Sequence, residues 1–116
     1  MHNFKEFQVW KRAIELVKEI YRMTAKFPDD EKFGIISQLR RCAVSVPSNI
    51  AEGSGRKTDK DFSNFLSISL GSQFELETQL IISKEIGFIS DTELKTITIE
   101  LNEIQKMTRT LINKFS

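Results

Sequence analysis

The chain has 116 residues, a length that suits one compact domain with a hydrophobic core, so we expect a single domain over residues 1–116. Its 17 lysine and arginine residues nearly balance its 16 aspartate and glutamate residues, and a formal net charge of +1 does not by itself demand a nucleic-acid or membrane partner. A single cysteine excludes an internal disulfide framework, and the lack of a signal-peptide pattern or a long apolar run predicts a soluble cytoplasmic protein.

The first predicted helix covers residues 4–26, because its apolar residues recur at spacings of three and four along the chain. Asn3 and Glu6 form a candidate capping pair at its start, and Pro28 ends it. The second predicted helix begins within residues 29–33, where acidic side chains favour the positive end of a helix. Helices are expected throughout, since no segment shows a sustained alternation of apolar and polar residues.

The helical apolar pattern of residues 38–53 continues through Pro47. A proline inside a helix removes the N–H that the carbonyl of Ala43 would accept, at a cost of about 3 kcal/mol or more. The stretch is either one kinked helix or two shorter helices, and the shared outward face of its unusual residues favours a proline-kinked second helix. That face carries the polar residues Gln38, Arg41, Ser45, Ser48, Asn49 and Glu52. They either form a surface for assembly or binding, or satisfy carbonyls that the proline releases.

Two further helices complete the predicted fold. Residues 53–57 form the clearest loop, and Thr58 is a candidate N-cap for a third helix over residues 59–86. Gly87 suits a left-handed helix end, and residues 90–93 form a capping box for the fourth helix. Short connections favour antiparallel neighbours, which predicts an all-α, up-down-up-down four-helix bundle.

The third predicted helix carries more apolar residues than a single core-facing stripe needs. The surplus positions are Leu70, Phe74, Ile81 and Ile82. A contiguous exposed apolar surface usually marks a protein partner, so we expect these residues to form an interface between copies of the chain. Gly71 is a candidate for close helix packing, because a glycine inside a helix costs about 1 kcal/mol. Arg41 is expected level with Glu75, and the two either pair at the helix seam or stay separately solvated.

The sequence lacks the residue sets that support common catalytic chemistry. Its only histidine, His2, lies outside the first helix, which excludes Ser-His-Asp and Cys-His arrangements and the paired Glu-x-x-His motifs of di-metal bundles. Cys42 is interpreted as a small buried residue rather than as a reactive nucleophile. We therefore expect no enzyme activity, no metal, no cofactor and no small-molecule substrate.

Basic residues form modest groups along the first two helices and around the loop that follows them. The candidate nucleic-acid-binding residues are Lys11, Arg12, Lys18, Arg22, Arg40, Arg41, Arg56 and Lys57. Acidic residues interrupt each group, as is typical of a solvated helix face. Repetition of a weak basic patch around an oligomer would multiply its phosphate contacts, so a nucleic-acid footprint stays open as the alternative.

The motif around Pro47 resembles a family signature. Gln38-Leu39-Arg40-Arg41, followed by Ser45-Val46-Pro47-Ser48-Asn49-Ile50-Ala51-Glu52-Gly53, is similar to the central motif of a small bacterial four-helix-bundle family. That family is encoded within intervening sequences of large-subunit (23S) ribosomal RNA genes. The matching motif positions are Gln38, Arg41, Ser45, Pro47, Asn49, Glu52, Gly71, Ser72 and Glu75. The sequence departs from the usual pattern at Cys42 and Ser69, where alanine is common.

The resemblance implies a four-helix bundle that assembles as a homopentamer. The related accessory variability proteins of diversity-generating retroelements bind nucleic acid and a reverse transcriptase, whereas the intervening-sequence members have no settled activity. We expect a non-enzymatic homo-oligomer that binds structured RNA or a nucleoprotein through basic surface residues. The alternative is a scaffold that recognises a polypeptide through the polar face of the second helix, with Gln38, Arg41, Ser45 and Asn49.

Overall fold

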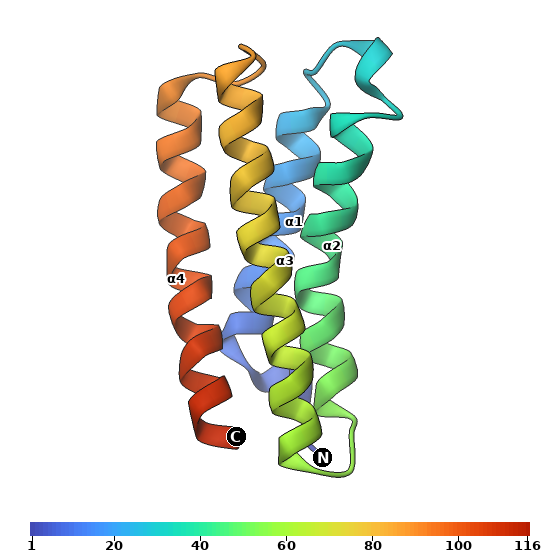
Figure 1. The fold of residues 1–116 in the computed structure, drawn as a ribbon, viewed down its shortest axis with the longest axis vertical. Coiled ribbons are helices and arrows are strands. Elements are labelled where there is room, and N and C mark those ends of the chain that lie inside the picture. Colours follow the sequence, from blue (N-terminus) through green and yellow to red (C-terminus); the bar gives the residue numbers. More distant parts are fainter.

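The computed structural model describes residues 1–116 and contains four long α-helices and no strand. The helices are α1 (Gln8–Thr24), α2 (Ile35–Ser54), α3 (Asp59–Glu85) and α4 (Asp91–Phe115), with two short 3-10 helices, η1 (Phe4–Glu6) and η2 (Asp29–Glu31). They form an elongated bundle with principal extents of 43 × 24 × 19 Å (Figure 1). The prediction of an all-α fold with four helices is confirmed.

Successive helices run in opposite directions along the long axis of the bundle, and both chain termini lie at the same end (Figure 1). Each helix contacts its neighbours in the chain, and α1 also contacts α4. The α1 and α3 helices share no close backbone contact, because they occupy diagonal positions across the core. The outer faces of α1 and α3 therefore lie on opposite sides of the molecule.

The core consists of the apolar stripes that the sequence pattern predicts. Leu16 in α1, Leu39 in α2, Leu66 in α3 and Leu101 in α4 are all fully buried. Burial of one such side chain contributes about 1.5–3 kcal/mol relative to leaving it exposed. Tertiary packing of these stripes, more than helix propensity, therefore holds the four helices in place.

Three predicted helix ends are confirmed by their hydrogen bonds and backbone geometry. The side chain of Thr58 accepts a hydrogen bond from the backbone N–H of Asp61 at 3.1 Å, at the start of α3. Ser90 and Glu93 form a reciprocal capping box at the start of α4, with distances of 2.9 and 3.0 Å. Gly87 has a φ of 88°, a left-handed conformation that glycine adopts without steric cost.

Two predicted helix starts are wrong. The α1 helix begins at Gln8 rather than at residue 4, because Phe7 adopts an extended conformation (φ −75°, ψ 126°) that separates η1 from α1. Asn3 consequently caps η1 and not α1. The α2 helix begins at Ile35, after η2 and a turn, because the backbone of Gly34 is not helical (φ −107°, ψ −116°).

Pro47 is buried inside α2, and the helix continues on both sides of it, so the alternative of two shorter helices is wrong. Its polar neighbours do not donate to the carbonyl of Ala43. Asn49 Nδ2 instead donates to the carbonyl oxygen and hydroxyl oxygen of Ser45, at 2.9 and 3.0 Å. The Ser45 hydroxyl also shares a hydrogen bond of 2.8 Å with the Ser72 hydroxyl, which joins α2 to α3. A kink at Pro47 stays a prediction.

Gly53 lies within α2 rather than in the predicted loop of residues 53–57. It is buried against the first two turns of α3. A Cβ atom added to Gly53 would lie 2.5 Å from Cβ of Phe65 and 3.0 Å from Cδ1 of Phe62. Glycine is therefore required here for the close approach of the two helices.

Candidate nucleic-acid interface

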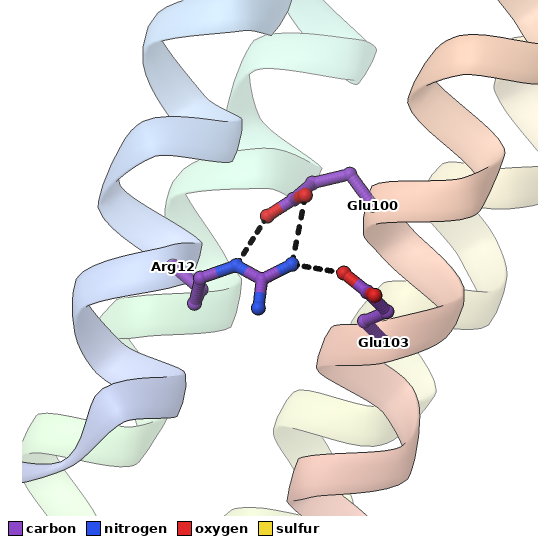
Figure 2. Close-up of polar contacts among 3 residues, drawn as sticks. All are labelled: Arg12, Glu100 and Glu103. Carbon is purple, nitrogen blue, oxygen red and sulfur yellow. Dashed lines mark hydrogen bonds and ion pairs between the residues drawn. The ribbon is translucent and has the colours of Figure 1, made fainter.

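Arg12 extends from α1 toward two carboxylates of α4 (Figure 2). Its Nε and Nη2 donate hydrogen bonds to the two carboxylate oxygens of Glu100 at 2.6 and 2.8 Å, and Nη2 also contacts Glu103. The hydrogen bonds with Glu100 hold the pKa of Arg12 above its ordinary value, and they hold the pKa of Glu100 below its ordinary value. Arg12, a candidate phosphate ligand in the sequence, thus connects α1 to α4.

The pair of Arg12 and Glu100 predicts a loss of stability in acid. A carboxyl group whose pKa is lowered by folding contributes stability above its ordinary value of 4.5, and this contribution disappears as the pH falls through the lowered pKa. Because the pair is partly exposed, we expect the wild type to lose about 1 kcal/mol more than Arg12→Met between about pH 6 and about pH 3. Urea unfolding at both pH values measures this difference, and equal losses in the two proteins would contradict the assignment.

Three other candidate cations also have carboxylate partners within the chain. These exposed pairs are Lys18 with Glu15, Arg22 with Glu19, and Arg56 with Glu52. Exposed ion pairs are worth only about 0–1 kcal/mol, but a phosphate at these positions must still compete with a carboxylate. Lys11 and Lys57 are exposed and stand outside these pairs.

The last two candidate cations, Arg40 and Arg41, lie in a groove between the end of α1 and the start of α2. We call this feature the basic aromatic groove; its volume is about 500 Å³. Its lining residues are Tyr21, Lys32, Phe33, Ile36, Ser37, Arg40, Arg41 and Val44. Three of them are cations and none is a carboxylate, so the groove favours an anion. The α1–α2 connection lies at the end of the bundle opposite both termini (Figure 1).

Arg40 is held in position within the basic aromatic groove. Its guanidinium carbon lies 4.4 Å from the centre of the Tyr21 ring, within the range of a cation–π contact. Its Nε donates a hydrogen bond to the hydroxyl oxygen of Thr24 at 2.9 Å, and that hydroxyl donates to the carbonyl of Ile20 at 2.7 Å. Since Thr24 is buried, the guanidinium is anchored to a fixed point of α1.

Phe33 is the most exposed large apolar side chain of the chain, with 91% of its surface accessible to solvent. It lies in the turn between η2 and α2, where the Lys32 N–H donates to the Asp29 carbonyl at 3.1 Å and the Gly34 N–H donates to the Glu31 carbonyl at 3.0 Å. The Lys32 ammonium lies 5.8 Å from the centre of the Phe33 ring. The turn therefore presents an aromatic ring and a cation together to solvent.

Lys32 and Phe33 were not among the residues that the sequence pattern selected. Because the second helix was predicted to begin within residues 29–33, the sequence did not predict whether the Phe33 side chain faces the core or solvent. A local signal was present, because Phe33 lies between a lysine and a glycine, outside the periodic core stripe of α2. An aromatic residue beside a cation in a turn is a combination found in nucleic-acid-binding surfaces.

A second groove, between α2 and α3, collects much of the motif; we call it the polar groove. Its lining residues are Phe33, Ser37, Gln38, Arg41, Cys42, Ser45, Ser72, Glu75 and Gln79, around a volume of about 350 Å³. Arg41 and Glu75 line the same groove, but no ion pair joins them, and Glu75 instead accepts a long contact of 3.7 Å from Cys42 Sγ. The two grooves share Phe33, Ser37 and Arg41, which form the ridge between them.

Cys42 is buried, as the sequence pattern predicts. Its Sγ donates to the carbonyl oxygen of Ser72 at 3.0 Å. Burial, aided by the charge of Glu75, raises the pKa of this thiol to about 12. The raised pKa disfavours the thiolate, which is the nucleophilic form of a cysteine.

The remaining motif and interface residues lie outside the two grooves. Pro47 is buried, Asn49 is half-buried, and Glu52 pairs with Arg56. Gly71 is exposed, and no atom of the chain lies within 4 Å of the place of its missing Cβ, so it does not serve close packing within one chain. The predicted apolar interface residues of α3 comprise exposed Phe74, Ile81 and Ile82 together with half-buried Leu70.

No group of histidine, cysteine, aspartate and glutamate side chains in the structure has an arrangement that could hold a metal ion. None of the helices combines the length and the apolar character needed to cross a membrane.

The family model of the 23S rRNA-intervening sequence protein matches residues 5–110. The chain belongs to this family. A solved structure from Bacteroides thetaiotaomicron VPI-5482, described as a protein with unknown function from the S23 ribosomal protein family, is also similar. It is 24% identical, covers 90% of this chain and 95% of its own, and superposes with a TM-score of 0.84, which supports the fold. No curated protein gives a significant match to the sequence.

Proposed function

We propose that this member of the 23S rRNA-intervening sequence protein family is a non-enzymatic homo-oligomer that binds structured RNA, free or within a nucleoprotein. The observation that carries the proposal is the basic aromatic groove, where Lys32, Arg40 and Arg41 accompany two aromatic rings without a carboxylate in the lining.

The three cations suit phosphate in complementary ways. A guanidinium group presents a planar fork of N–H donors that matches two phosphate oxygens, whereas a lysine ammonium acts as a compact point charge. Arg40 is already oriented by Tyr21 and Thr24, so less side-chain entropy is lost when it binds. Lys32 and Arg41 are exposed and free to adjust to the path of the backbone.

Binding of a labelled RNA hairpin over a range of salt concentrations tests this function, with fluorescence anisotropy as the measurement. Three phosphate contacts predict a slope of about −2 to −3 for the logarithm of the association constant against the logarithm of the salt concentration. RNA binding that is undetectable at low salt, or that does not change with salt, would refute the proposal.

The homo-oligomeric part of the proposal is supported by the outer face of α3. Phe74, Ile81 and Ile82 expose 42, 44 and 45% of their surfaces, which is unusual for neighbouring large apolar side chains on one helix. This face lies diagonally across the bundle from α1, so contact between copies at α3 leaves the α1 side of the basic aromatic groove accessible. A homopentamer, as the family resemblance implies, would present five such grooves.

We expect Phe74→Glu to convert the oligomer to a monomer, because a carboxylate buried at the interface would lose its hydration. The variant should still fold, since Phe74 is partly exposed and the Arg109 guanidinium carbon lies 5.4 Å from its ring, where a cation can accompany the new charge. Light scattering after size-exclusion chromatography measures the mass. Ile99→Glu, at a position on α4 that is 65% exposed, is the matched control and should keep the wild-type mass. A wild-type monomer would contradict the oligomeric part of the proposal.

The second candidate function is recognition of a polypeptide by the polar groove. The favouring observation is that Gln38, Arg41 and Glu75 line this groove with donors and acceptors of both charges, as peptide groups require. Gln38→Ala combined with Glu75→Ala would then abolish binding of the polypeptide and preserve the affinity for RNA. RNA affinity that depends on Lys32, which lines only the basic aromatic groove, favours the RNA function instead.

A further inference from the structure

We infer that the basic aromatic groove is selective for unpaired nucleotides, with the Phe33 ring as the platform on which one base stacks. Lys32, Arg40 and Arg41 hold the phosphates that flank that base. The inference rests on the proposed RNA-binding function and specifies the class of RNA that this site takes. Single-stranded loops, bulges and ends of a structured RNA would therefore bind the groove through both a base and its flanking phosphates. A regular duplex would bind only through its phosphates.

The first argument is the exposure of Phe33. With 91% of its surface in solvent, the ring contributes almost nothing to the core, although an aromatic ring offers a large apolar area for burial. The turn that carries it is fixed by backbone hydrogen bonds at 3.1 and 3.0 Å on either side. The backbone that carries the ring is therefore defined, and the ring points from it into solvent, where a base can reach it.

The second argument is the charge around the ring. A protein surface that covered Phe33 would also cover Lys32 and Arg41. Glu75 lines the polar groove with Arg41, but no carboxylate lines a groove with Lys32, so the partner would have to supply at least one. A nucleic-acid strand carries one phosphate per nucleotide, so it supplies the anions together with the base that covers the ring. Charge complementarity thus selects a nucleic-acid occupant for this ring.

The third argument is the position of Arg40 in the same groove. The Arg40 guanidinium carbon lies 4.4 Å from the centre of the Tyr21 ring, within the same groove as Phe33. Bases in single-stranded RNA stack on aromatic rings and on arginine planes alike. In a groove of about 500 Å³, a base that stacks on Phe33 would lie beside the Arg40 guanidinium, which could then contact that base or its phosphate.

The selectivity against duplex follows from the accessibility of the base faces. In a paired helix each base is stacked between its neighbours, so Phe33 has no face to contact and only the three cations contribute. In a single strand the base can turn out of the stack and cover the ring. Removal of the ring should therefore weaken binding of single strands specifically.

The test compares wild type, Phe33→Leu and Phe33→Trp for binding to oligouridine and to an RNA duplex of equal length, by fluorescence anisotropy at low salt. We expect Phe33→Leu to weaken oligouridine binding by about 5- to 150-fold, and to leave duplex binding and the salt slopes unchanged. Phe33→Trp should retain or increase the affinity for oligouridine, because the larger ring still stacks. Ile99→Ala, which removes another exposed apolar side chain on α4, is the matched control and should change neither affinity.

Two results would overturn the inference and leave the proposed function intact: equal oligouridine binding by Phe33→Leu and wild type, or an equal loss for oligouridine and duplex. A lower oligomeric mass of Phe33→Leu by light scattering would also overturn it, because Phe33 would then be a contact between copies. If wild type binds neither RNA at low salt, the proposed function and the inference fail together. Circular dichroism should give the same melting temperature for all variants, since Phe33 makes no core contact.

Discussion

Gly53→Ala is expected to lower the free energy of unfolding by about 1–3 kcal/mol, as overpacking of a closely packed site does. The added methyl group would lie 2.5 Å from Cβ of Phe65, 3.0 Å from Cδ1 of Phe62 and 3.3 Å from the carbonyl oxygen of Phe62. Neither a Cβ atom nor a backbone oxygen can rotate away, so α2 and α3 must separate. Urea unfolding followed by circular dichroism measures the change.

Gly71→Ala is the matched control for this prediction, because it makes the same substitution inside α3 at an exposed site. No atom of the chain lies within 4 Å of the added methyl group. The better helix propensity of alanine should therefore raise the stability of the isolated chain by up to about 1 kcal/mol. Gly53→Ala at wild-type stability would show that the two helices absorb the methyl group, contrary to the prediction. If Gly71 instead packs against a second copy, Gly71→Ala should lower the oligomeric mass.

The helix ends that depend on adjacent residues could be predicted from the sequence. Thr58, Ser90 and Gly87 each act within three or four residues of their position, through one hydrogen bond or one dihedral angle. The apolar stripes were equally predictable, because a helix brings residues three and four apart onto one face regardless of its surroundings. Together these local signals were sufficient to predict that the chain forms four helices.

The start of α2 illustrates where local signals fail. The acidic residues 29–31 favour the beginning of a helix, and they do form a helical turn, but it is the separate 3-10 helix η2. Gly34 is the local signal, but Gly53 and Gly71 lie inside helices, so a glycine alone does not locate the non-helical backbone that ends this turn. The exposure of Phe33 follows from that backbone, so the most informative residue of the candidate site could not be assigned from periodicity.

Charge pairing between distant residues was also beyond the sequence. Arg12 and Glu100 are 88 positions apart, and only the contact of α1 with α4 brings them within hydrogen-bonding distance. From the sequence alone, Arg12 and Arg41 are equally candidate phosphate ligands. In the structure, Arg12 is bonded to Glu100 and Glu103, whereas no ion pair joins Arg41 to a carboxylate. The distinction between a structural cation and one free to bind phosphate therefore requires the packed bundle.

The last prediction uses that distinction. We expect the double variant Lys32→Gln/Arg41→Gln to bind oligouridine about 10- to 100-fold more weakly at low salt, because two charge-assisted contacts to phosphate are lost. The slope of the logarithm of the association constant against the logarithm of the salt concentration should fall in magnitude by about 1.4, or 0.7 for each phosphate contact. Both side chains are exposed, so the variant should keep the melting temperature of the wild type.

Lys18→Gln/Arg22→Gln is the matched control, since it removes the same number of positive charges from candidate cations of α1 that have carboxylate partners. If the groove binds the RNA, this control should change the affinity by less than about 3-fold, as expected for screened charges outside the contact. An equal loss in both double variants would mean that the overall charge of the protein, and not the groove, attracts RNA. A larger loss in the control would place the RNA on the outer face of α1, where the ion pairs with Glu15 and Glu19 would have to open on binding.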